Sequence, residues 1–270
     1  MRIHIGPAGI PLSSEKGDTA SGIAKVAELG LDAMEVEFVR GVHMGVDAAM
    51  QVGKAAQKTG IMLSVHAPYF INLCNPEKAK ASEKRILDSC ERAHHMGAWI
   101  VVFHPGYYGK LEKKDALRLV EESCMEMSSV ISKKGWEVML GLETTGKFSQ
   151  FGTLDEIIEI CSRNRGCVPV IDWAHLYAYH QGKPDYRAII RKVTDAGYAR
   201  IHTHFSNINF SDKGERNHLA LSHRKPDFRD VAKVILASGL VEVTLISESP
   251  ELENDALVMK KDFQGLGHRF

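Results

Sequence analysis

Short apolar runs alternate with longer amphipathic segments from one end of the chain to the other. Runs of about four to eight apolar residues bounded by loop residues are typical of strands buried on both faces. They predict strands over residues 2–6, 32–39, 61–66, 99–104, 137–143, 168–172, 199–204 and 241–247. The segments between them repeat their apolar positions with helical spacing. This spacing predicts helices over residues 17–29, 46–59, 77–96, 113–134, 154–162, 185–196, 227–238 and 254–263.

Eight strands that alternate with eight helices in 270 residues predict a (β/α)8 TIM barrel, with residues 1–270 in a single domain. Glycine follows several of the predicted helices, as at Gly60, Gly97 and Gly135, which is the usual way to end a helix. A doubly wound open sheet is the structural alternative, but no glycine-rich phosphate loop follows the first strand. The longest connection, residues 205–226, is where a barrel is expected to carry a functional loop.

Composition narrows the protein class. The chain is 44% hydrophobic and 25% charged with a formal net charge of zero, which is ordinary globular usage and gives no bulk support for nucleic-acid binding. No apolar run is long enough to cross a membrane, and the first residues lack the apolar core of a signal peptide. The five cysteines form no CxxC pair, so we expect free thiols and a cytoplasmic protein.

One stretch combines a buried strand with polar chemistry. The apolar run that begins at Val168 ends on Asp172, and His175 follows three residues later. A buried carboxylate is costly unless something compensates its charge, and a divalent metal such as zinc or manganese is a common partner for both side chains. The alternative is that Asp172 only caps the following helix, with His175 in its first turn.

The same pattern recurs at the ends of six successive strands. In a TIM barrel the active site lies at the C-terminal ends of the strands. The third to eighth strands carry there, in chain order, His66, His104, Glu143, Asp172 with His175, His202 with His204, and Glu248. A single histidine would more often be a satisfied core residue, but six strands in register favour a metal site.

These ligands are more than a single ion needs, because a zinc site takes about four. A carboxylate between two ions can bridge them, and ions about 3.5–4 Å apart can hold a phosphoryl group. The pattern therefore predicts a multinuclear hydrolytic site acting on a phosphodiester. The loop at residues 205–226 adds Asp212, Glu215, His218 and His223 among Lys213, Arg216 and Arg224; it is either part of this site or a solvated polar loop.

Nearly the whole chain resembles the endonuclease IV family of zinc-dependent apurinic/apyrimidinic endonucleases, a branch of the xylose-isomerase-like barrels. The motifs that carry the resemblance are His66-Ala-Pro-Tyr-Phe-Ile-Asn-Leu, His104-Pro-Gly, Glu143-Thr-Thr-Gly, Ile171-Asp-Trp-Ala-His175, His204-Phe-Ser-Asn and Glu248-Ser-Pro. The resemblance implies a (β/α)8 barrel with three Zn²⁺ ions, or Mn²⁺ in their place. It implies a first ion on His66, His104 and Glu143, and a second on Glu143, Asp172, His204 and Glu248. A third ion would lie on His175, His218 and a loop carboxylate.

Two departures affect this assignment. The family's loop motif for the third ion is Asp-x-His, whereas this chain has Gly214-Glu-Arg-Asn-His218, so Glu215 is the candidate for the carboxylate. The family has His-x-Asn-Asp after the seventh strand, whereas this chain has His204-Phe-Ser-Asn207. His202 and His204 lie on the same face of their strand, and His204 is assigned because it is nearer the strand end and matches the motif.

The resemblance also implies the substrate, which is double-stranded DNA with abasic sites. A metal-bridging hydroxide would attack the phosphodiester 5′ to the abasic site, with Glu143 and Glu248 as the candidate catalytic residues, and the protein would act as a monomer. Tyr69 and Phe70 match side chains that wedge into the duplex, and Arg40 would enter the minor groove. The alternatives are that the two aromatic residues pack their loop onto the barrel and that Arg40 is solvated.

Two other functions compete with this one. A mononuclear sugar isomerase or epimerase of the xylose-isomerase-like group would share Glu143, Asp172, His204 and Glu248 around one metal, with the two glutamates moving protons. It would not need His66, His104 or His218. The third interpretation is a metal-holding barrel that binds nucleic acid without cutting it.

Overall fold

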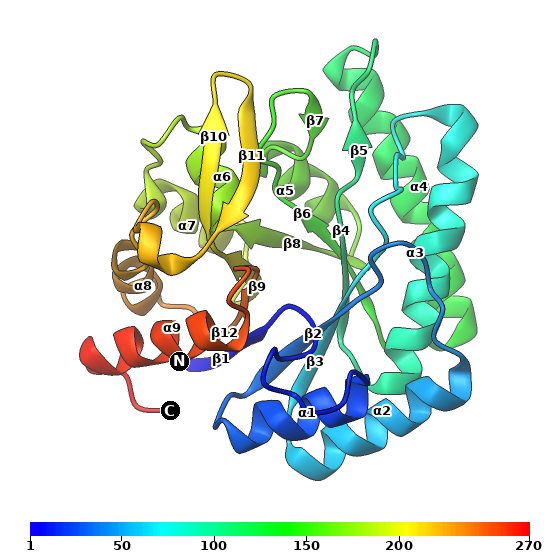
Figure 1. Cartoon of the computed structure of the whole chain (residues 1–270). Helices are drawn as coiled ribbons and strands as arrows, with labels where there is room; N and C mark the ends of the chain where they lie inside the picture. The colour runs from blue at the N-terminus through cyan, green and yellow to red at the C-terminus, as the bar shows by residue number, and fades with distance from the viewer.

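The computed structural model describes residues 1–270. An eight-stranded parallel sheet forms its centre, and Figure 1 shows the helices around it. These strands are β1 (Arg2–Pro7), β2 (Ala33–Glu37), β3 (Met62–His66), β4 (Ile100–Phe103), β6 (Met139–Glu143), β8 (Cys167–Asp172), β9 (Arg200–Phe205) and β12 (Glu242–Ser247). Their order in the sheet is β1-β12-β9-β8-β6-β4-β3-β2, and a parallel bridge between Ala8 and Glu35 joins the two edge strands. The predicted (β/α)8 TIM barrel is confirmed.

Nine α-helices accompany the strands. They are α1 (Thr19–Glu28), α2 (Val46–Thr59), α3 (Pro76–Met96), α4 (Lys113–Lys134), α5 (Leu154–Arg163), α6 (Trp173–Tyr179), α7 (Tyr186–Asp195), α8 (Phe228–Leu236) and α9 (Glu253–Gly265). Eight of them match the predicted helices, and α6 is the addition. Gly60, Gly97 and Gly135 end their helices in the left-handed conformation, which costs glycine little because it has no Cβ. None of the helices combines the length and hydropathy needed to cross a membrane.

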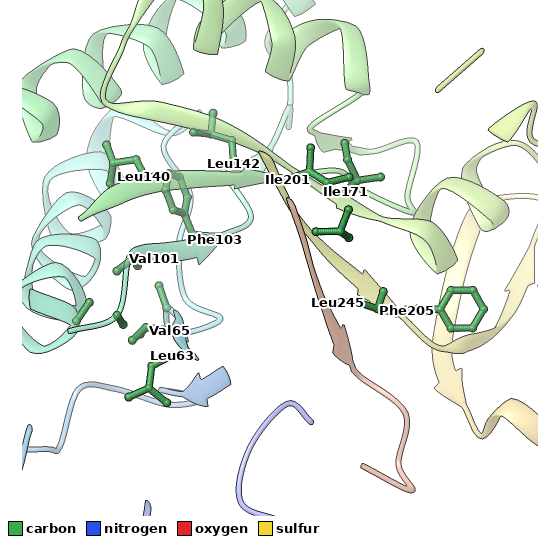
Figure 2. Close-up of a cluster of buried hydrophobic side chains, with 14 of the residues drawn as sticks. Leu63, Val65, Val101, Phe103, Leu140, Leu142, Ile171, Ile201, Phe205 and Leu245 are labelled. Carbon is green, nitrogen blue, oxygen red and sulfur yellow. The ribbon is translucent and has the colours of Figure 1, made fainter. Parts of the chain in front are cut away.

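Alternation along the strands separates an apolar outer layer from a polar interior. One large cluster of buried hydrophobic side chains includes a set that alternates along the strands, and Figure 2 shows it: Leu63, Val65, Val101, Phe103, Leu140, Leu142, Ile171, Ile201, Phe205 and Leu245. Because successive side chains of a strand point to opposite faces, the residues between these positions face the barrel interior.

The barrel interior is unusually rich in charged side chains. On β2, the side chains of Glu35 and Glu37 face the interior, and on β9 those of His202 and His204 do so. A small apolar cluster of Ile100, Val102 and Val170 fills another part of the interior. TIM barrels are commonly filled by layers of branched apolar residues, so the polar positions here need a compensating chemistry.

The connection predicted as a loop at residues 205–226 is instead largely a β-hairpin. Its strands are β10 (Asn207–Ser211) and β11 (Gly214–Leu219), followed by the short 3₁₀ helix η1 (Leu221–His223). The hairpin has few apolar positions, so alternation could not reveal it. It packs on α6 through Ile208 and Phe210, and the latter meets the Tyr177 ring edge-on.

The hairpin turn is attached to the loop that follows β6. Gly214 forms a bridge with Lys147, and the Glu215 amide donates to the Gly146 carbonyl at 2.9 Å. Gly214 has φ +98°, and a Cβ there would lie 2.1 Å from the Gly146 oxygen, so glycine is required at this contact. The second small sheet pairs β5 (Gly106–Tyr107) with β7 (Gln150–Phe151). Both additions contribute residues to the C-terminal mouth of the barrel.

Candidate metal centre

The predicted ligands come together at the C-terminal end of the barrel. Most lie at or just past the ends of strands, whereas His175 lies in α6 and Glu215 and His218 lie on β11. They form three overlapping groups whose ligand atoms lie within 4.8 Å of one another: His66 with His104 and Glu143; Glu143 with Asp172, His204 and Glu248; and Asp172 with His175, His218 and Glu248. The first two sets contain the same residues as the first two predicted ion sites, whereas the third contains Asp172 and Glu248 in place of the predicted loop carboxylate Glu215.

The first group is arranged around one oxygen of Glu143. Its Oε2 lies 3.2 Å from His66 Nε2 and 3.1 Å from His104 Nε2. The other nitrogen of His66, Nδ1, donates to the Ala67 carbonyl at 2.8 Å, so a neutral His66 carries no proton on Nε2. Two lone pairs then face each other across 3.2 Å, and only a proton or a metal cation between them relieves this repulsion.

The second group uses the other oxygen of Glu143. Oε1 of Glu143 lies 3.0 Å from His204 Nδ1, which is also 3.1 Å from Glu248 Oε1. Glu143, Asp172 and His204 have no exposed surface. Because each oxygen of Glu143 faces a different group, this carboxylate is placed to bridge two ions.

Asp172 has two functions at once. Its Oδ1 accepts from the His175 amide at 2.6 Å and thereby caps α6, as the alternative interpretation of this stretch required. Its Oδ2 is buried and has no hydrogen-bond partner. It has a 3.5 Å charge contact with His175 Nδ1. A carboxylate oxygen that is buried without a hydrogen bond is costly, and a ligand role for Oδ2 reduces that cost. Capping and metal binding are therefore compatible here.

The third group is organised around His175. Its Nδ1 donates to the Thr144 carbonyl at 3.0 Å, while its Nε2 lies 3.3 Å from His218 Nε2 and 3.3 Å from Glu215 Oε2. The Ser206 hydroxyl lies 2.7 Å from His218 Nδ1 and fixes that ring. Glu215 lies outside the set of four but contacts His175. Two other polar residues of the connection, Asp212 and His223, are exposed and do not join the site.

The ionisation of these groups shows how strongly they interact. Burial alone would raise the pKa of Glu143, but the charges of His104 and His204 outweigh it and hold that pKa well below its usual range. Burial raises the pKa of Glu248 to about 7. Burial opposes the charged form of His66, yet the hydrogen bond and charges of the neighbouring carboxylates raise its pKa to about 10. Burial lowers the pKa of His104 to about 4.

The donor set therefore fits divalent metal ions. Imidazole and carboxylate are the ligands of zinc and are also used by manganese. A cation would give the buried Oδ2 of Asp172, which has no hydrogen bond, a partner and would replace the proton between His66 Nε2 and Glu143, and the Nδ1 protons of His66 and His175 direct Nε2 toward the groups.

Two carboxylates in the barrel interior, the buried Glu35 and the half-buried Glu37, were not identified from the sequence. Glu35 and Glu37 alternate with Met34 and Val36 on β2, and both face the barrel interior. Burial raises the pKa of Glu37 to about 8, and its Oε1 has no hydrogen-bond partner. The signal was present, because two glutamates at alternate positions of an otherwise apolar barrel strand must face inward together.

A cavity of about 660 Å³ opens above the three groups. Its lining includes Glu37, His66, His104, His175, Glu215, His218 and Glu248, with Lys147 and Arg216 among the remainder. Tyr69 also lines it, with its ring 6.5 Å from that of His66. Tyr69 and Phe70 are 65% and 64% exposed, and Arg40 is exposed on the segment after β2. All three candidate DNA contacts thus lie on the surface at the barrel mouth.

Comparison with known proteins identifies the family. The sequence model described as xylose isomerase-like TIM barrel matches residues 23–266. An uncharacterized protein of Methanocaldococcus jannaschii is 35% identical over 279 residues, covering 98% of this chain and 98% of that protein. A protein of Mesomycoplasma hyopneumoniae named "Probable endonuclease 4" is 28% identical over 213 residues, covering 73% of this chain and 75% of that protein.

Solved structures agree on the fold. Endonuclease IV from Thermus thermophilus has a TM-score of 0.75 at 17% identity and covers 98% of each chain. A D-tagatose 3-epimerase-like protein has a TM-score of 0.74 at 22% identity and covers 96% of each chain. At these identities the similarity shows the shared barrel alone, and the nearly equal scores do not favour either activity.

Proposed function

The chain belongs to the xylose isomerase-like TIM barrel family, and on that premise we propose that it is a metal-dependent endonuclease. Its substrate is double-stranded DNA, and it cleaves the phosphodiester on the 5′ side of an abasic site. The observation that carries the proposal is the set of three overlapping ligand groups that share Glu143, Asp172 and Glu248. A mononuclear sugar enzyme needs only one of them. The similarity to proteins named endonuclease 4 supports the same assignment.

The proposed ligands of the first two ions follow from the groups, and those of the third combine two group members with Glu215, which contacts His175. His66, His104 and Glu143 hold the first ion, and Glu143, Asp172, His204 and Glu248 hold the second. His175, His218 and Glu215 hold the third, with Zn²⁺ as the expected metal and Mn²⁺ as its replacement. When bound, divalent ions supply Lewis acidity toward a phosphoryl group and lower the pKa of water.

The chain's own residues bind and orient the substrate. Lys147 and Arg216 line the cavity and provide positive charge for the DNA backbone phosphates. Glu143 contacts the histidines of the first and second ligand groups through its two oxygens and so orients both groups. Glu248 lies on the cavity side of His204, with its Oε1 3.1 Å from His204 Nδ1. The complete burial of Glu143, Asp172 and His204 keeps bulk water away from the reacting end of the cavity.

Tyr69 and Phe70 are proposed to enter the duplex beside the abasic site, with Arg40 in the minor groove. Replacement of both aromatic residues by alanine should weaken binding of abasic DNA about tenfold or more, since stacking on one base contributes about 1–3 kcal/mol. Bound metal should not change. Fluorescence anisotropy with a labelled duplex measures the effect. Phe270→Ala is the control, because Phe270 is 44% exposed and does not line the cavity. Equal affinity of the double variant and the control would remove these two residues from the interface.

The direct test is cleavage of a duplex oligonucleotide that contains one tetrahydrofuran abasic-site analogue. Zinc-loaded protein should make a single cut on the 5′ side and leave a 3′-hydroxyl, whereas an undamaged duplex of the same sequence should stay intact. Parallel reactions with manganese-loaded protein identify the preferred metal. If fully metal-loaded protein leaves the abasic strand uncut, the proposed activity is wrong.

One observation favours the second candidate, a sugar isomerase or epimerase. Glu37 adds another carboxylate to the cavity wall. A carboxylate there is better suited to hydrogen bonds with sugar hydroxyls than to a phosphate. In that activity the metal lies on Glu143, Asp172, His204 and Glu248, and the two glutamates transfer protons. Incubation of metal-loaded protein with a panel of ketoses, followed by NMR, tests this candidate on the same preparation.

A further inference from the structure

A second layer of acid and imidazole groups lies beneath the metal centre, inside the barrel. We infer that Glu35 and His202 are positioning residues for His204, so that His204 presents Nδ1, and not Nε2, to the ions. The inference deepens the proposed function and rests on it only in taking His204 as a metal ligand. Neither residue belongs to the three ligand groups of the proposed metal centre.

The contacts form a chain across the barrel from β2 to β9. Glu35 Oε2 accepts a hydrogen bond from His202 Nε2 at 2.9 Å. Glu35 Oε1 lies at the same distance from His204 Nε2, as a charge contact whose angles do not meet those of a hydrogen bond. All three side chains have no exposed surface. The Trp99 ring packs against His202 at 5.9 Å between centroids and supports it from the N-terminal side. Glu35 is thus held between two imidazoles with both oxygens in contact.

The two nitrogens of His204 face opposite carboxylates. Nδ1 lies 3.0 Å from Glu143 and 3.1 Å from Glu248, whereas Nε2 faces only Glu35. A neutral imidazole carries one proton; a cation in the second ligand group would take the Nδ1 lone pair, and the proton would then lie on Nε2, where the buried Glu35 carboxylate stabilises it. The Nδ1 lone pair is then directed at the second ligand group. Metal-binding histidines commonly have such a carboxylate on the other ring nitrogen, which fixes both tautomer and ring orientation.

The position of Glu35 fits an orienting role better than a ligand role. It lies one interior position below Glu37 on β2 and pairs in register with Ser64, whereas Glu37 pairs with His66. It does not line the cavity, and its oxygens are already within 2.9 Å of two imidazole nitrogens. His202 also lies one interior position below His204, so an acid–imidazole pair underlies the centre.

The test measures metal binding without any substrate. Glu35→Gln keeps the shape of the side chain but removes its charge. It should lower the affinity for one of the bound ions by about 10–100-fold, the usual effect of losing such a partner. Zinc competition titrations and elemental analysis measure the loss, and Co²⁺-substituted protein should show an altered d–d spectrum. Glu242→Gln is the matched control, since Glu242 is a buried barrel glutamate paired with His4 and Arg2 at the opposite end of its strand.

A second variant keeps the inference testable if Glu35→Gln does not fold. His202→Asn should change zinc affinity and the Co²⁺ spectrum in the same direction as Glu35→Gln but by a smaller amount, because Glu35 still contacts His204 in this variant. Unchanged affinity and spectrum in the folded variants would overturn the inference. So would four ions in the wild type and three in Glu35→Gln with unchanged affinities, because Glu35, His202 and His204 would then bind an ion of their own. Altered metal binding together with uncut abasic DNA would refute the endonuclease but support the positioning role.

Discussion

Glu143→Gln should lower the rate of abasic-site cleavage by at least about 10³-fold, on the scale of losing a central electrostatic contact in an active site. The carboxylate is fully buried, and its two oxygens contact His66 and His104 on one side and His204 on the other. Glutamine has the same shape but only one acceptor oxygen, and its amide group adds protons where a ligand lone pair is needed. One change therefore weakens two of the three ligand groups.

The measurement is single-turnover cleavage of the abasic duplex, with metal content determined on the same preparation. Glu83→Gln is the control: Glu83 is 7% exposed, lies on α3 and accepts from the Ser123 hydroxyl, away from the cavity. We expect the control to cleave at the wild-type rate. Near-normal cleavage by Glu143→Gln with its metal bound would contradict the interpretation that Glu143 bridges two catalytic metal ions. Loss of cleavage with retained ketose epimerisation would point to the sugar enzyme instead.

The set of ligands at the strand ends could be predicted because it depends only on the barrel. Parallel strands end at the same rim, so His66, His104, Glu143, Asp172 and Glu248 had to converge once eight βα units were recognised. The short apolar strands and the glycine-ended helices can be recognised from local sequence patterns, and this is enough to predict the eight βα units. The structure adds the distances, which show that Glu143 divides its oxygens between two groups.

The acid–imidazole pair below the centre could not be found from strand ends. Glu35 and His202 lie in the middle of the barrel, on strands that are far apart in the sequence, and only the closed register brings them to 2.9 Å. Nearness to the strand end identifies His204 as the metal ligand but predicts no role for His202. The structure places both on the same interior face and gives His202 a carboxylate partner.

The position of Glu215 depends on hairpin geometry that no sequence pattern revealed. The register of β10 and β11 shifts between Asn209 and Phe210, so that Phe210 pairs with Glu215. This bulge decides which side chains of β11 point toward α6. With the Gly214 contact to the neighbouring loop, it brings Glu215 to 3.3 Å from His175. An Asp-x-His spacing rule could not have predicted this arrangement.

Removal of the metal ions should lower the melting temperature by about 8–16 °C at about pH 8. A ligand present at about a thousandfold excess over its Kd stabilises the folded state by about 4 kcal/mol. For a chain of this size each kcal/mol is about 2–4 °C. Without the ions, buried carboxylates and imidazoles face one another uncompensated, and proton uptake is the remaining way to reduce the repulsion.

The size of this effect should depend on pH in a defined direction. Burial raises the pKa of Glu248 to about 7 and that of Glu37 to about 8, so the metal-free fold loses stability as pH rises from their unfolded values through that range. His66, with its pKa raised to about 10, keeps a proton that competes with metal and favours the metal-free fold at low pH. The difference in melting temperature between metal-loaded and metal-free protein should therefore increase from about pH 5.5 to about pH 8, as measured by calorimetry on both forms.

In Glu143→Gln this difference should be smaller at every pH, because two ligand groups are already weakened. Equal melting temperatures of the metal-loaded and metal-free wild type at about pH 8 would show that the stability of the buried groups does not depend on metal.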